Sequence, residues 1–102
     1  MLTAIRRRSG EVLIPAPVVA QVIRNPARQV ILSRFLQQRH VQIVPLRAED
    51  SFVIGELLGR TRTSDVVDAH VVLCAQRAGH TVVTSDPTDI RRLAPDIPLL
   101  LV

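Results

Sequence analysis

The stretch that decides the fold is Thr63-Ser64-Asp65-Val66-Val67-Asp68-Ala69-His70, which is followed by an apolar run, a glycine and then Thr84-Ser85-Asp86. A helix from Asp65 to Ala78 would advance about 1.5 Å per residue, or roughly 20 Å in all. After a turn at Gly79, a strand over residues 80–85 would return at about 3.3 Å per residue, again roughly 20 Å. Because the two displacements nearly cancel, we expect the acids to meet at the carboxyl edge of a parallel sheet, where open α/β folds bind ligands.

Asp65, Asp68 and Asp86 are therefore the candidate catalytic and metal-ligating residues. Gathered carboxylates repel one another unless a cation lies between them, and oxygen ligands of this kind suit Mg²⁺ or Mn²⁺. Structural roles compete with this interpretation. Asp65 is also an excellent helix N-cap that would place Asp68 at the third helical position, and Asp86 before Pro87 could begin a turn.

The bulk properties predict one domain over residues 1–102. A hydrophobic fraction of 47% excludes a disordered chain. No apolar run approaches the ~18–20 residues that cross a bilayer, and no signal-peptide pattern is present, so a cytoplasmic location is expected. All 13 basic residues are arginines, which suit phosphate contacts, although an arginine-only set can also reflect the composition of the source genome. The lone Cys74 is expected to be a small buried hydrophobe and His70 a structural or interface residue.

Helical and strand patterns alternate along the chain. Helices are predicted over residues 2–8, 18–23, 27–38, 48–59, from 65 onward and over 88–93, and strands over 11–14, 41–46, 81–84 and 98–102. This alternation predicts an α/β fold, with a parallel β-sheet flanked by helices.

Three segments carry a more specific pattern: Asp68-Ala69-His70-Val71-Val72-Leu73-Cys74-Ala75, the glycine turn and strand over residues 78–86, and the strand and helix over residues 12–22. Together they resemble the PIN domain family, the fold of VapC-type toxin ribonucleases. The resemblance implies that acidic side chains hold Mg²⁺ or Mn²⁺, which activates water for attack on an RNA phosphodiester. It also implies two partners, a cognate antitoxin protein and a second copy of the chain in a homodimer.

The family's roles carry over to particular positions. By the resemblance, Asp68 and Asp86 match two metal-site acids, and Asp65 is a supporting acid. Thr84 would orient a carboxylate or a bound water. Asp89 could be a peripheral ligand, although a surface or helix-start position explains it as well.

The chain also departs from the family pattern. The family's glutamate on the helix of the segment over residues 12–22 is replaced by Gln21, and the usual first strand with its aspartate is missing. Since that strand is central in the family's strand order, 3-2-1-4-5, we expect an N-terminally truncated PIN-like domain. The central strand could be supplied by upstream sequence or by strand exchange with a partner. Alternatively, the sheet could close by direct pairing of the strands at Val12 and Val82. Arg24 and Arg28 could line a path for RNA phosphates.

Three functions remain open at this stage. The first is a toxin-like, metal-dependent endoribonuclease, weakened or inactivated by the missing aspartate. The second is a catalytically dead PIN remnant that acts as a dimerisation or antitoxin-binding module. The third, a receiver-like domain with an acidic Mg²⁺ pocket, is disfavoured because that design needs a lysine and this chain has none.

Overall fold

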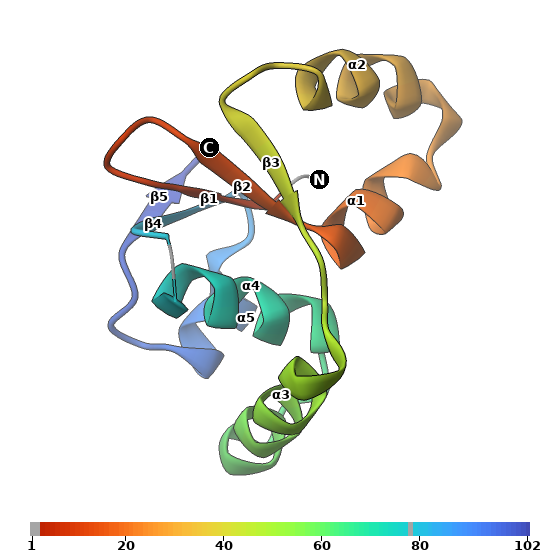
Figure 1. The fold of residues 1–102 in the computed structure, drawn as a ribbon. Coiled ribbons are helices and arrows are strands. Elements are labelled where there is room, and N and C mark those ends of the chain that lie inside the picture. The colour runs from red at the N-terminus through yellow and green to blue at the C-terminus, as the bar shows by residue number, and fades with distance from the viewer. Residues whose placement is uncertain (1–2, 78) are drawn as a thin grey trace.

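The computed structural model describes residues 3–77 and 79–102, apart from the side chain of Arg28. Over these described residues the chain forms five strands and five helices, whose arrangement is drawn in Figure 1. In order they are β1 (Ala4–Arg6), β2 (Val12–Pro15), α1 (Ala16–Ile23), α2 (Pro26–Leu36), β3 (Val41–Val44), α3 (Ala48–Thr61), α4 (Val66–Arg77), β4 (Thr81–Thr84), α5 (Pro87–Leu93) and β5 (Leu99–Leu101).

The strands form one sheet in the order β3-β2-β1-β4-β5. β2 pairs with β3 in parallel, and β4 pairs with β5 in parallel, whereas β1 runs antiparallel to both of its neighbours. The predicted α/β class is confirmed, with a mainly parallel sheet flanked by helices. The strand order is the one that the family resemblance implied.

The segment after Leu2 corrects a prediction, because it is a strand and not part of a helix over residues 2–8. Ile5 pairs with Leu13 on one side and with Val82 on the other, so β1 fills the central position of the sheet. Ile5 is fully buried there. The local residue preferences of this segment favour a helix. Without β1, however, the edges of β2 and β4 would hold unpaired backbone groups inside the sheet, and their free-energy cost exceeds the small gain from helix propensity.

The antiparallel direction of β1 follows from a tight connection to β2. The Arg7 amide donates to the carbonyl oxygen of Glu11 at 2.8 Å, and Gly10 adopts a φ of 88°, which favours glycine. This hairpin keeps the β2 strand from pairing directly with the β4 strand, contrary to one of the predicted repairs. The central strand therefore comes from this chain itself, in reversed direction.

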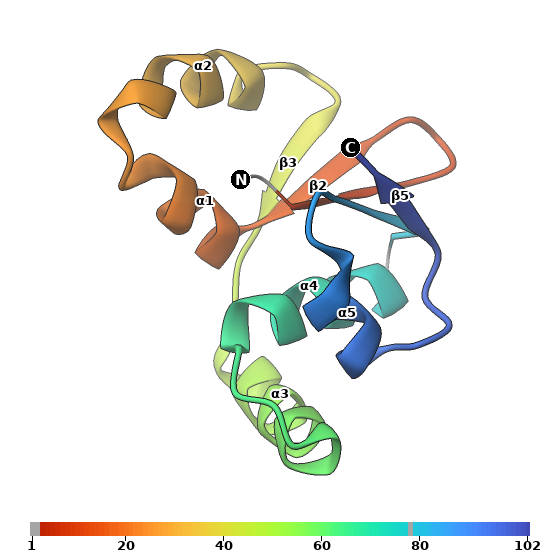
Figure 2. The same cartoon turned by 180° about the vertical axis from the view of Figure 1, so that it is seen from behind.

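The helices pack on the sheet in two groups. α4 lies against β1, β2 and β4, and α3 and α5 pack on α4 (Figures 1 and 2). α1 contacts β2 and β3, and α2 contacts β3, away from α3 (Figure 2). The core between α4 and the sheet is built from small aliphatic side chains, among them Ala69, Val71, Val72 and Val82. Because α4 is held on both sides, the position of its first turn relative to β4 is well defined.

The other predicted elements are found, with ends that shift by at most two residues. Proline explains several starts: α2 and α5 begin at Pro26 and Pro87, where the missing amide hydrogen is not needed. Of the described helices, none combines the length and the apolar character that a membrane crossing requires.

Candidate functional site

The first turn of α4 is organised by Asp65. Its Oδ1 accepts a hydrogen bond from the backbone amide of Asp68 at 3.0 Å, which is the geometry of a helix N-cap. Asp68 is thereby fixed at the third helical position, as the sequence predicted. The cap uses Oδ1, one of the two carboxylate oxygens of Asp65.

Three carboxylates gather at this point: Asp65, Asp68 and Asp89, from the first turn of α5, each offer an oxygen, and these oxygens all lie within 4.8 Å of one another. Oxygens that share one Mg²⁺ are at most about 4.2 Å apart, twice the usual ligand distance. The group therefore fits a hard divalent cation after a small closure of the side chains. Asp89, which sequence reasoning treated as peripheral, is a full member of this group.

The electrostatics of the group are dominated by Asp68. Burial raises the pKa of its carboxyl to about 7, and the neighbouring charges of Asp65, Asp89 and Asp86 add to the increase. A cation held between these carboxylates would relieve the repulsion and lower this pKa. The cost of gathering the charges is the physical reason to expect a ligand here.

Asp86 lies outside this three-carboxylate group, although its charge contributes to the raised pKa of Asp68. It follows β4, and its backbone amide donates to Thr84 Oγ1 at 3.1 Å. Thr84 Oγ1 also lies 3.3 Å from Thr3 Oγ1, and both threonines are buried. Thr84 therefore positions the backbone of Asp86 and links it to Thr3, which directly precedes β1. The expected contact of Thr84 with a carboxylate or a bound water stays a prediction. No motif in the sequence indicated Thr3.

The remaining predicted residues lie on or beside α1 and α2. Gln21 is exposed on α1, and its amide forms no hydrogen bond with any described residue. Arg24 is exposed at the end of α1. The side chain of Arg28 lies outside the described part of the structure. The structure therefore does not bring Gln21 into the carboxylate group.

Two arginines that sequence reasoning missed, Arg62 and Arg92, line a cavity together with Asp65 and Asp89. No signal in the sequence could single them out, because every basic residue of the chain is an arginine. Only the packing of α3 and α5 on α4 brings them beside the acids.

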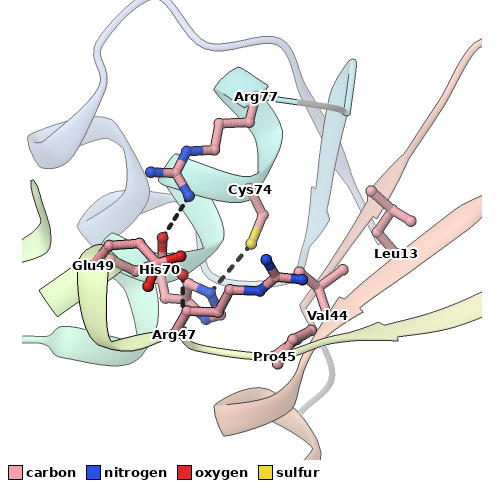
Figure 3. A pocket seen from close by; sticks show the side chains of 9 residues that line it. Leu13, Val44, Pro45, Arg47, Glu49, His70, Cys74 and Arg77 are labelled. Atoms are coloured by element: carbon pink, nitrogen blue, oxygen red, sulfur yellow. Dashed lines mark hydrogen bonds and ion pairs between the residues drawn. The ribbon is translucent and has the colours of Figure 1, made fainter.

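A second cavity, of about 230 Å³, lies between α3, α4 and the ends of β2 and β3 (Figure 3). Asp50 is buried there and accepts hydrogen bonds from the Arg47 amide at 2.9 Å and the Arg77 guanidinium at 2.5 Å, which hold the pKa of its carboxyl below the usual value. His70 Nε2 lies 3.4 Å from Cys74 Sγ. Burial lowers the pKa of His70 and raises that of Cys74 to about 11. These groups join α3 to α4, which agrees with the structural roles expected for His70 and Cys74.

The raised pKa of Asp68 predicts a pH dependence of stability. The carboxyl binds its proton more tightly in the folded chain (about 7) than in the unfolded chain (3.8), so its ionisation destabilises the fold. We expect the melting temperature in EDTA to fall as pH rises from about 4 to about 7, relative to that of Asp68→Asn. Differential scanning fluorimetry of both proteins across this range measures the difference. Parallel curves would contradict the raised pKa.

Comparison with known proteins adds one match. A family model described as the PIN domain covers residues 2–94. A search of curated proteins and a search of solved structures each find no match. The matched residues include every aspartate discussed above.

Proposed function

The chain belongs to the PIN domain family, and we propose that it is a toxin-type endoribonuclease of that family that uses Mg²⁺ or Mn²⁺. Membership of the family indicates nuclease activity in general and the use of divalent metals. The toxin role, RNA as the substrate and the residues that carry out the reaction are the proposal.

One observation carries the proposal: Asp65, Asp68 and Asp89 present oxygens within 4.8 Å of one another, at the edge of the sheet where β4 ends. The raised pKa of Asp68 supports it, because carboxylates that repel one another gain the most from a bound cation. Hard oxygen donors without a thiol or imidazole suit Mg²⁺ or Mn²⁺ better than softer metals.

Phosphodiester hydrolysis requires a water molecule to lose a proton as it attacks phosphorus, and the departing oxygen to gain one. A divalent cation supplies polarisation of the phosphoryl oxygen and a lowered pKa of water. In this chain Asp65, Asp68 and Asp89 would hold that cation. Asp86, fixed through its backbone by Thr84, would face the same site from the end of β4 and add negative charge.

Partners are part of the same proposal. The helices α2 and α3 expose large apolar side chains, with Val30 62%, Ile31 73% and Phe52 78% accessible. Exposed apolar groups of this size are typical of surfaces that bind other proteins. They support a cognate antitoxin and a homodimer as the partners that cover α2 and α3.

A second candidate function is a non-catalytic module that binds an antitoxin or dimerises. The position of Gln21 favours it, because the residue that replaces the expected glutamate is exposed and forms no hydrogen bond to the described acids. The acids would then serve as helix caps and surface charges. The two candidates differ in one measurable property, the cleavage of RNA.

The deciding experiment is a cleavage assay on labelled single-stranded RNA with Mg²⁺, Mn²⁺ or EDTA. Cleavage that needs the divalent cation supports the nuclease. Its absence with both metals, in a folded protein, would favour the binding module.

A further inference from the structure

A cavity of about 340 Å³ adjoins the carboxylate group. It lies between the end of α3, the loop before α4 and the helix α5. Its lining consists of Arg62, Thr63, Ser64, Asp65, Asp89, Arg92 and Leu93. Because Asp65 and Asp89 belong both to this lining and to the carboxylate group, the cavity and the proposed metal site are continuous.

Two arginines in this cavity have no side-chain partner among the residues that the structure describes. Within the described residues, neither Arg62 nor Arg92 forms an ion pair or a side-chain hydrogen bond. Other arginines do so: Arg77 pairs with Asp50, and Arg91 donates to the carbonyl oxygens of Pro95 and Ile97. The guanidinium groups of Arg62 and Arg92 are therefore available to a ligand.

The backbone conformation of Arg62 is a second argument for a ligand-binding role of this residue. Arg62 ends α3 with φ 56° and ψ 43°, and it alone among the described non-glycine residues has a positive φ. This left-handed conformation is disfavoured for residues with a branched or long side chain, and it is more common for asparagine and glycine. Local backbone preference therefore does not explain an arginine at this position.

We propose that Arg62 and Arg92 bind a backbone phosphate of a single-stranded RNA next to the phosphodiester that lies at the carboxylate group. A guanidinium can donate two parallel hydrogen bonds to phosphate oxygens, which a lysine ammonium cannot do. The proposal rests on the nuclease function above. It adds the path of the substrate strand, which passes from Asp68 along Asp65 and Asp89 into this cavity.

Salt dependence of RNA binding tests the proposal. Binding of a fluorescent ten-nucleotide single-stranded RNA is measured by anisotropy at several KCl concentrations, in EDTA and in the Asp68→Asn background, so that the RNA stays intact. Removing one arginine that neutralises a phosphate lowers the slope of log K against log salt by about 0.7. Because both arginines contact the same phosphate, we expect the Arg62→Gln, Arg92→Gln double variant to lower the slope by about that amount and each single variant to lower it by less.

Two further variants separate a phosphate contact from a general decrease in charge. Arg60→Gln removes the same charge from the last turn of α3, where the side chain lines a different cavity, and should leave the slope unchanged. Arg62→Lys combined with Arg92→Lys should keep the slope but weaken binding, because lysine retains the charge without the paired donors. Melting curves confirm that each variant is folded.

An unchanged slope in the Arg62→Gln, Arg92→Gln double variant overturns this proposal, and so does an equal change in Arg60→Gln. The nuclease function is judged separately, from metal-dependent cleavage by the chain with its native Asp68. If that chain cleaves RNA while the double variant keeps its slope, only the phosphate contact is wrong. If RNA is neither bound nor cleaved, both proposals are wrong.

Discussion

Asp68→Asn should abolish metal-dependent RNA cleavage, with a decrease of at least about 100-fold, equivalent to about 2.7 kcal/mol of transition-state stabilisation. Burial, and then the neighbouring charges, raise the pKa of the Asp68 carboxyl, so a bound cation would stabilise its ionised form. The amide keeps the shape of the side chain but neither its charge nor its affinity for Mg²⁺. Cleavage rates at saturating Mn²⁺ give the comparison.

The same substitution should separate activity from stability. In EDTA at pH 7.5, Asp68→Asn should melt at a higher temperature than the native chain, because it removes repulsion with Asp65, Asp89 and Asp86. Mn²⁺ should raise the melting temperature of the native chain by several degrees and leave that of the variant unchanged. Asp96→Asn, which neutralises an exposed acid before β5, is the matched control and should behave as the native chain. An equal Mn²⁺ shift in all three proteins would contradict metal binding at Asp68.

Gly79→Ala should destabilise the fold by about 3 kcal/mol, at the upper end of the cost of overpacking a core. A Cβ at this position would lie 1.8 Å from Ile5 Cγ2 and 3.2 Å from Ala75 Cα. Ile5 is fully buried in the central strand, so its side chain cannot move away from the added Cβ without disturbing the sheet. For a domain of this size each kcal/mol lowers the melting temperature by about 4–8 °C, which thermal denaturation resolves readily.

Two companion variants define what this result means. Gly55→Ala, at an open position on α3 with nothing within 4 Å, should stabilise the fold by about 0.5–1 kcal/mol. Ile5→Leu removes the methyl branch that the new Cβ would meet, so it should recover part of the stability in the double variant. A Gly79→Ala protein as stable as the native chain would show that Ile5 does not occupy the centre of the sheet.

Most of the fold was predictable because its signals are local. The apolar run after Asp68, the glycine turn and the strand over residues 81–84 predicted α4 and β4, and proline marked the start of α5. The N-terminal strand was not predictable in this way. Its residues have no strand pattern, and they form β1 only because β2 and β4 both offer unpaired edges to the same segment.

The candidate site was predictable in part, for a geometric reason. The lengths of α4 and β4 bring the first turn of α4 to the edge where β4 ends, as the sequence indicated. They do not fix the rotation of α5, however, and this rotation brings Asp89 into the carboxylate group while Asp86 lies outside it. Arg62 and Arg92 depend likewise on the packing of helices that are distant in the sequence.

The central strand also constrains how the chain reaches its native state. β1 and β2 can form their hairpin early, because they are neighbours in sequence, but Ile5 meets Val82 only after nearly the whole chain is available. During synthesis on the ribosome, one edge of β1 therefore stays unpaired until β4 has emerged. Contacts of such high sequence separation slow folding. Until β4 pairs with it, the unpaired edge of β1 can pair with strands of other chains. Refolding rate and aggregation should therefore depend more on the β1–β4 pairing than on any other pairing in the sheet.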